Sequence, residues 1–175
     1  MSRLTAVLAV AFALAACATL DVGSDFDHAA SFAGYQTFAW MAREHPTISN
    51  PLNIRRVQDA VSAELEAKGL RPAADVSQAD LAVDFTLSSA ERTEVTSYPV
   101  EYRGAWPWGE GYFGSAVDVR QYREGTLSID LFDARSHRPV WHGWAKKPLS
   151  RADLDHPDAP LREAVAAILS RYPPR

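Results

Sequence analysis

Two segments in which apolar and polar residues alternate constrain the fold of this chain most strongly. A period of two places the apolar side chains on one face of a strand and the polar side chains on the other. The apolar positions are Leu81, Val83, Phe85 and Leu87 in the first segment and Leu127, Ile129 and Leu131 in the second. We therefore predict two strands that are each buried on one face. A polar turn over residues 133–138 follows, and residues 140–145 are predicted to return as a hairpin partner.

Two helices with one apolar stripe each are predicted on either side of these strands. Asn50 followed by Pro51 is typical of a helix start, with Asn as the N-cap and Pro at the first helical position. Gly69 suits the left-handed residue that ends such a helix. The stripes consist of Ile54, Val57, Val61 and Leu65 in the first helix and Leu161, Val165, Ile168 and Tyr172 in the second.

The order of the predicted elements indicates the architecture. Two short strands, near residues 20–22 and 35–40, precede the first helix, and the alternating strands, a long insert and the second helix follow. A helix between two strands implies a right-handed crossover between parallel neighbours, whereas the hairpin adds antiparallel strands. We predict an α+β fold, a two-layer sandwich in which a mixed sheet of four to five strands has both helices packed on one face.

The only cysteine, Cys17, directly follows an apolar run that begins at Leu4 and is preceded by Arg3. The run is shorter than the roughly 20 residues that span a bilayer and has the form of a secretory signal. The sequence Leu14-Ala15-Ala16-Cys17 resembles a bacterial lipobox. The resemblance implies cleavage before Cys17, a diacylglycerol on its thiol and a fatty acid such as palmitate on its new amine. Two alternatives stay open, an ordinary signal peptide cut near Ala16 and an uncleaved apolar tail.

These features lead to a prediction of location. We expect residues 1–16 to be a lipoprotein signal peptide and residues 17–175 to form one periplasmic domain, anchored to membrane lipid through acylated Cys17. Two lipid signals suffice for stable anchoring. Ala18, rather than Asp, follows Cys17, which in the lipoproteins that this chain resembles favours the outer membrane, facing the periplasm. The net charge of −4 and the lack of a Lys/Arg block give no support for nucleic-acid binding.

The sequence contains no recognisable catalytic motif, since G-x-S-x-G, H-E-x-x-H and the P-loop pattern are all missing. No histidine has a partner four residues away, and no second cysteine exists for a zinc site. His142 is predicted to be a half-buried sheet residue. The acidic residues Asp153, Asp155 and Asp158 are predicted to form a solvated loop with a helix cap rather than a calcium loop. We expect no enzyme activity, no cofactor and no metal.

A long insert, at about residues 96–123, is rich in aromatic residues, Gly and Pro. We predict that Gly and Pro interrupt any helix or long strand there. Long connections in small domains tend to carry function. The residues predicted to contact a partner or ligand are Tyr102, Trp106, Trp108, Tyr112 and Phe113. The alternative is a loop that folds over the open face of the sheet and buries Trp108 and Tyr112 as a satellite core.

Several short motifs in a fixed order resemble the bacterial lipoprotein family catalogued as domain of unknown function 4136. They are Asp25-Phe26-Asp27, Phe32-x-x-Tyr35-x-Thr37-Phe38-x-Trp40, Leu65-x-x-Lys68-Gly69, Ala79-Asp80-Leu81, the stretch from Gly125 to Asp133, Val140-Trp141-x-Gly143-x-Ala145 and Ile168-Leu169-x-x-Tyr172-Pro173. The resemblance implies an anchored envelope lipoprotein with no assigned activity and lends no catalytic residue. We therefore expect a non-enzymatic module that binds or scaffolds an envelope protein. The alternative is a small-molecule or glycan carrier that uses the insert.

Overall fold

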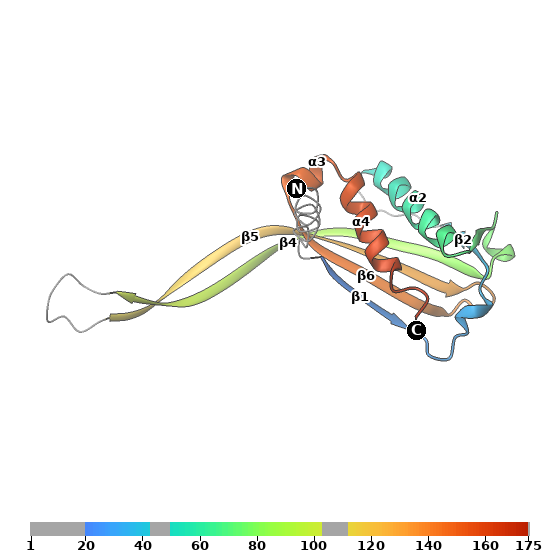
Figure 1. Ribbon diagram of the computed structural model, residues 1–175. Coiled ribbons are helices and arrows are strands. Elements are labelled where there is room, and N and C mark those ends of the chain that lie inside the picture. Colours follow the sequence, from blue (N-terminus) through green and yellow to red (C-terminus); the bar gives the residue numbers. More distant parts are fainter. Residues whose placement is uncertain (1–19, 43–49, 103–111, 175) are drawn as a thin grey trace, which may run out of the picture.

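A mixed sheet with helices on one face forms the body of the protein (Figure 1). The computed structural model describes residues 20–42, 50–102 and 112–174, with only the backbone at 99–102, 112–114 and 116. Six strands occur in this part of the chain, in the spatial order β1-β6-β5-β4-β2-β3. Their bounds are β1 Asp21–Phe26, β2 Thr37–Trp40, β3 Arg71–Pro72, β4 Leu81–Tyr102, β5 Tyr112–Asp133 and β6 Pro139–Leu149. Strand β2 runs parallel to β3 and β4, and the other neighbours are antiparallel.

The α+β class, the mixed sheet and the parallel crossover through a helix are confirmed. The predicted count of four to five strands is wrong, because the described residues form six. The shortest strand, β3, has two exposed residues, Arg71 and Pro72, and pairs with β2. Two exposed residues carry no alternating pattern, so this strand leaves no signal in the sequence.

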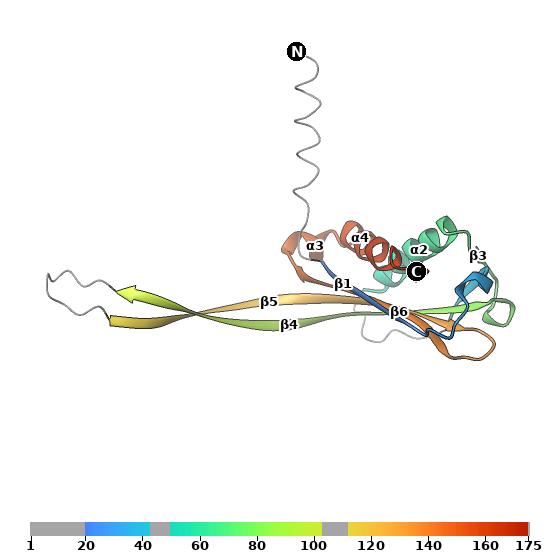
Figure 2. The same ribbon diagram turned by 60° about the horizontal axis from the view of Figure 1, so that its bottom comes forward.

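The helices α2 (Pro51–Ala67), α3 (Arg151–Asp155) and α4 (Asp158–Leu169) lie on the same side of the sheet (Figure 2). The predicted ends of α2 are confirmed. The Asn50 side chain accepts a hydrogen bond from the backbone N–H of Leu52 at 3.0 Å. Gly69 has a φ of 93°, and the N–H of Leu70 donates to the carbonyl of Leu65 at 3.1 Å, which is a Schellman ending.

The short helix α3 was not predicted. Its N-cap Ser150 and the Asp153 side chain form a capping box, in which each side chain bonds the backbone N–H of the other residue. Asp153 and Asp155 therefore lie in a helix, which corrects the prediction of a solvated loop for them, while Asp158 begins α4. Five residues are too few for an apolar stripe, and only the capping pair could have indicated this helix.

The core lies between the two layers, where the predicted faces meet. Helices α2 and α4 pack against each other and against the sheet. The predicted strand and helix residues share one buried cluster, namely Leu81, Val83, Phe85, Leu127, Ile129, Leu131, Val57, Val61, Leu65, Val165 and Ile168, with Ile54 partly buried beside it. Tyr172 is buried too and meets Trp141 edge to face, with ring centroids 5.6 Å apart. Burial raises the pKa of Tyr172 to about 12.

Asp80 joins the start of β4 to β2. Its Oδ2 accepts hydrogen bonds from the backbone N–H groups of Gln36 at 3.0 Å and Thr37 at 3.1 Å, and from the Thr37 hydroxyl at 2.9 Å. The bond from Gln36 and those from Thr37, with the charge of Arg135 nearby, lower the pKa of Asp80 below its ordinary value. This carboxylate therefore stabilises the fold only while it is ionised.

We expect Asp80→Asn to lower the free energy of unfolding by about 1–2 kcal/mol at pH 7, because a neutral amide oxygen replaces the charged acceptor of these hydrogen bonds. Because the folded pKa lies below the unfolded value of about 3.9, the contribution is present above that pH and disappears as pH falls through the folded pKa. The gap between wild type and Asp80→Asn in urea melts should therefore stay constant from pH 7 to about pH 5 and narrow as the pH falls below about 4. Asp59→Asn, which removes an exposed carboxylate from α2, is the control. A gap that stays constant with pH would contradict the assignment.

Candidate functional site

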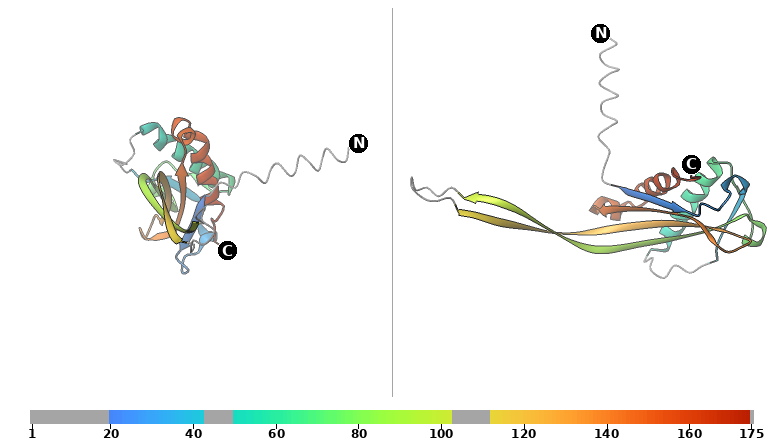
Figure 3. Two further views of the ribbon diagram at one scale, coloured as in Figure 1. Left: turned by 90° about the vertical axis from the view of Figure 1, so that its left-hand side faces the viewer. Right: turned by 90° about the horizontal axis from the view of Figure 1, so that it is seen from below.

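The β4–β5 hairpin extends far beyond the rest of the sheet (Figures 1 and 3). Each strand has 22 residues, and they pair in register from Leu81 with Asp133 to Tyr102 with Tyr112. Strand β2 pairs with β4 only as far as Val83, and β6 pairs with β5 only from Arg123 onward. Residues 92–102 and 112–122 thus have only each other as strand neighbours among the described residues. We call this part of the hairpin the arm.

The prediction that Gly and Pro interrupt any long strand here is wrong, since β4 continues through Pro99 and β5 through Gly114. A two-stranded ribbon explains the difference, because proline is tolerated where its missing N–H would face solvent rather than a neighbouring strand. The arm also has a strand signal that sequence reasoning missed. Val117 and Val119 alternate with Asp118 and Arg120 in β5, and β-branched residues favour strands.

The two faces of the arm differ in chemistry. Val95 pairs with Val119, and Val117 lies two residues along on the same face. Val95, Val117 and Val119 are 61%, 57% and 55% exposed. The opposite face carries charged and aromatic residues, namely Arg92, Glu94, Tyr98, Asp118, Arg120 and Tyr122. There, Arg120 Nε donates to Asp118 Oδ2 at 3.1 Å. The arm therefore has one face with three exposed valines among polar residues such as Thr93 and Gln121, an opposite face rich in charged residues, and two open strand edges.

The structure places three of the five predicted insert residues at the far end of the arm. Tyr102 and Tyr112 form the last pair of the hairpin, and Phe113 is paired with Glu101. Trp106, Trp108 and the predicted lipidation site Cys17 lie outside the described residues. The alternative of a loop folded over the open sheet face is wrong for the strands that carry Tyr102 and Tyr112, because the arm leads away from the sheet.

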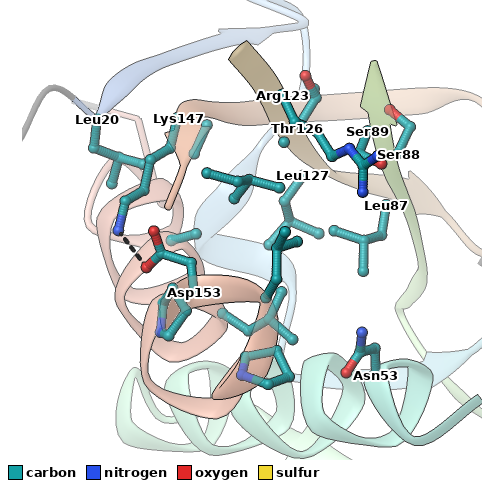
Figure 4. Close-up of a pocket in the computed structure, with 18 residues that line it drawn as sticks. Leu20, Asn53, Leu87, Ser88, Ser89, Arg123, Thr126, Leu127, Lys147 and Asp153 are labelled. Atoms are coloured by element: carbon teal, nitrogen blue, oxygen red, sulfur yellow. Dashed lines mark hydrogen bonds and ion pairs between the residues drawn. The ribbon is translucent and has the colours of Figure 1, made fainter. Parts of the chain in front are cut away.

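A pocket of about 230 Å³ lies at the root of the arm, between the sheet and the helices (Figure 4). Leucines form much of its wall, namely Leu20, Leu87, Leu127, Leu149, Leu154 and Leu161. Lys147 and Asp153 also line it and are paired, with Nζ 3.1 Å from Oδ1. An apolar cavity of about 150 Å³ can hold benzene, so this pocket has room for a small apolar group.

The sheet face opposite the helices carries a row of ionisable residues. Asp84, Asp130 and His142 occupy paired positions on β4, β5 and β6. His142 Nδ1 lies 2.6 Å from Asp130 Oδ1, and the His142 ring stacks on Trp144 with centroids 5.4 Å apart. His142 is half-buried in the sheet, as predicted. The contact between His142 and Asp130 joins β6 to β5 on this face.

The described ranges contain no group of three or more His, Cys, Asp or Glu side chains arranged to hold a metal ion. Within the same ranges, no helix has the length and apolar character needed to cross a bilayer.

Comparison with known proteins adds a family and a fold. The family described as "Domain of unknown function (DUF4136)" matches residues 22–174. A DUF4136 family protein from Bacteroides thetaiotaomicron is 15% identical, with a TM-score of 0.57 over 88% of this chain and 96% of that one. A PDZ domain protein from Parabacteroides distasonis is 16% identical, with a TM-score of 0.60 over 96% of this chain, which spans only 40% of that protein.

The same fold occurs in the PelC dodecamer from Paraburkholderia phytofirmans, which is 13% identical, with a TM-score of 0.51 over 87% of this chain and 96% of that one. At these identities the likeness concerns the fold. No curated protein matches the chain. Because the family match covers nearly all of the described chain, the protein belongs to the DUF4136 family.

Proposed function

We propose that this protein is a non-enzymatic binding or scaffolding module of the bacterial cell envelope. In this proposal, acylated Cys17 anchors it to the outer membrane on the periplasmic side, and the arm contacts an envelope protein. The observation that carries the proposal is the arm itself, a paired hairpin that leaves the sheet with both outer edges open and valines exposed on one face.

The physical chemistry of the arm supports a binding role. An isolated two-stranded hairpin is at best marginally stable in water, and three or more strands are needed for independent stability. Open strand edges present unpaired backbone groups to which another strand can be added. The exposed Val95, Val117 and Val119 add apolar area that a partner would bury. A partner strand that binds to an open edge would therefore also stabilise the arm.

The proposed anchor is close in sequence to a residue at the root of the arm. Leu20, the first described residue, lines the pocket at the root. Cys17 precedes Leu20 by three residues, which span at most about 11 Å when extended. Lipid at Cys17 would therefore hold the root of the arm close to the membrane surface.

We expect Cys17→Ser to abolish acyl labelling and to move the protein from the membrane fraction to the soluble fraction. The thiol is the proposed attachment atom, and loss of the acyl chains removes the roughly 0.8 kcal/mol that each buried methylene contributes. Metabolic labelling with an alkyne fatty acid and membrane fractionation measure both effects. Ala18→Ser is the control and should stay labelled and membrane-bound. Persistent labelling of Cys17→Ser would refute the lipid anchor.

Shortening the arm tests the binding role. Residues 93–121 are replaced by Asn-Gly, a two-residue turn that closes a hairpin between Arg92 and Tyr122, which are already paired. We expect this variant to fold with its stability changed by less than about 1 kcal/mol, because the arm lies outside the core. Wild type carrying a photo-crosslinker at Tyr98 should trap a protein in cells, whereas a crosslinker at Glu66, exposed on α2, should not. An arm that traps nothing in cells would overturn the proposal.

A second candidate function, a carrier of small molecules, is favoured by the pocket at the root of the arm. The glycan version of this idea relies instead on the aromatic residues of the insert. Leu161→Trp would fill the space while leaving the arm intact. A small molecule that is extracted from wild type and missing from Leu161→Trp would support the carrier over the scaffold.

A further inference from the structure

We propose that the arm pairs with the arm of a second copy of this chain, edge to edge along β5. The two β5 strands run antiparallel, with Val119 opposite Val119 of the second copy, and the two hairpins form one four-stranded ribbon. This inference rests on the proposed function of the arm as the contact element and names its partner.

The free edge of β5 has the right extent for this pairing. Among the described residues, β6 begins to pair with β5 at Arg123, so β5 has an open outer edge from Tyr112 to Tyr122. Pairing about Val119 engages residues 116–122 of both copies and stops where β6 begins. The outer edge of β4 is less suitable, because it contains Pro99, which lacks an N–H to donate.

The apolar residues of the arm become contiguous in this register. Val95 already pairs with Val119 across the hairpin. Placing Val119 opposite its own copy produces a row of four valines across four strands, in the order Val95, Val119, Val119, Val95. Val119 is 55% exposed in one copy, and its neighbours in the row would cover it. Four strands also exceed the number needed for a ribbon that is stable in water.

The charged residues agree with the same register. With Val119 at the centre, Asp118 lies opposite Arg120 of the second copy, and Arg120 lies opposite Asp118 of that copy. Glu94 pairs with Arg120 within the hairpin, so each Arg120 has a carboxylate on both sides. Registers centred on neighbouring residues of β5 do not place opposite charges next to each other in this way. A centre at Asp118 or Arg120 places like charges opposite each other, which is destabilising. A centre at Val117 places Arg120 opposite Gly114.

Cysteine crosslinking tests the pairing with the full chain in the bacterial envelope. Cα atoms of directly opposed antiparallel residues lie about 4.5–5.5 Å apart, within the roughly 7 Å limit for a disulfide. Val119→Cys should therefore yield a disulfide-linked dimer under mild oxidation. Val95→Cys is the control, since Val95 is equally exposed but would lie three strand spacings, about 14 Å, from its copy. Dimer formation by Val95→Cys and not by Val119→Cys would overturn the register.

Charge reversal tests the recognition itself, with Val119→Cys as the reporter in differently tagged copies. Asp118→Arg and Arg120→Asp should each reduce the homotypic crosslink by about fivefold or more, because two attractive contacts per dimer become repulsive. Co-expression of the two variants should restore a crosslink between the tags, because their charges are then opposite across the interface. Co-expression does not change the repulsion between residues 118 and 120 within one arm. If the Asp118–Arg120 pair acted only within its own arm, co-expression would therefore not restore the crosslink.

The outcomes separate this inference from the proposed function. Rescue between tags supports the pairing. If Val119→Cys does not dimerise, while Tyr98 still traps a different protein, the self-pairing is wrong and the binding role of the arm stands. If the arm traps nothing, both proposals fall. Homotypic and mixed crosslinks of equal strength would also overturn the pairing, since charge complementarity would then play no part.

Discussion

The substitution Val61→Lys is expected to unfold the domain at pH 7. Val61 is fully buried in the middle of α2, within the cluster that joins both helices to the sheet. A buried lysine must lose its proton or keep an unpaired charge, and pKa depressions of about 3–5 units at such sites correspond to roughly 4–7 kcal/mol at 1.36 kcal/mol per unit. Domains of this size are stabilised by only about 5–15 kcal/mol in total. Circular dichroism should show loss of the cooperative thermal transition.

The control for this prediction is Ala63→Lys, two residues along the same helix at an exposed position. It adds the same side chain and charge but leaves the core intact, so the free energy of unfolding should change by less than about 0.5 kcal/mol. A native melt of Val61→Lys, or equal effects of the two variants, would mean that α2 presents a different face to the sheet.

We expect Phe85→Ala to lower the free energy of unfolding by about 3–5 kcal/mol, because the lost ring leaves a cavity in a close-packed core. Phe85 lies on β4 with only 1% of its surface exposed, and its ring meets Trp40 edge to face at 5.9 Å. Urea unfolding followed by tryptophan fluorescence measures the change. The slope of the urea transition should be unchanged if the variant exposes the same surface area on unfolding as wild type.

Thr86→Ala provides the matched control on the adjacent, exposed position of the same strand. We expect it to change the free energy of unfolding by less than about 1 kcal/mol, since little buried area is lost. A loss near zero for Phe85→Ala, or a larger loss for Thr86→Ala, would contradict the assignment of the buried face of β4.

Local sequence was sufficient wherever the stabilising contacts are local. Asn50, Pro51 and Gly69 mark the ends of α2, because capping is decided within a few residues of each helix end. The buried faces of the central strands were correct for a related reason, since alternation alone assigns each side chain to a face. The short motifs indicated the DUF4136 family, and the family match over residues 22–174 confirms this assignment.

The arm could not be predicted because its strands are ordered by pairing between residues that are far apart in the chain. Whether Pro99 breaks a strand depends on which edge of the strand it faces, and that is decided by its pairing with Ser115. Val119 lies opposite Val95, which is 119 − 95 = 24 residues earlier in the chain. A count of Gly and Pro in the insert carries no information about that register. Strand β3 and helix α3 were missed because elements of two and five residues have no period.

The sequence by itself determined the class of the fold, the buried faces and the ends of α2, because periodicity and capping follow from geometry that repeats within a few residues. Only the tertiary structure decided that the insert is a hairpin extending beyond the sheet, that Val95, Val117 and Val119 lie together on one face, and that a pocket lies at its root. These features arise from contacts between residues distant in sequence. Their free energy depends on pairing and burial that no local pattern of residues specifies.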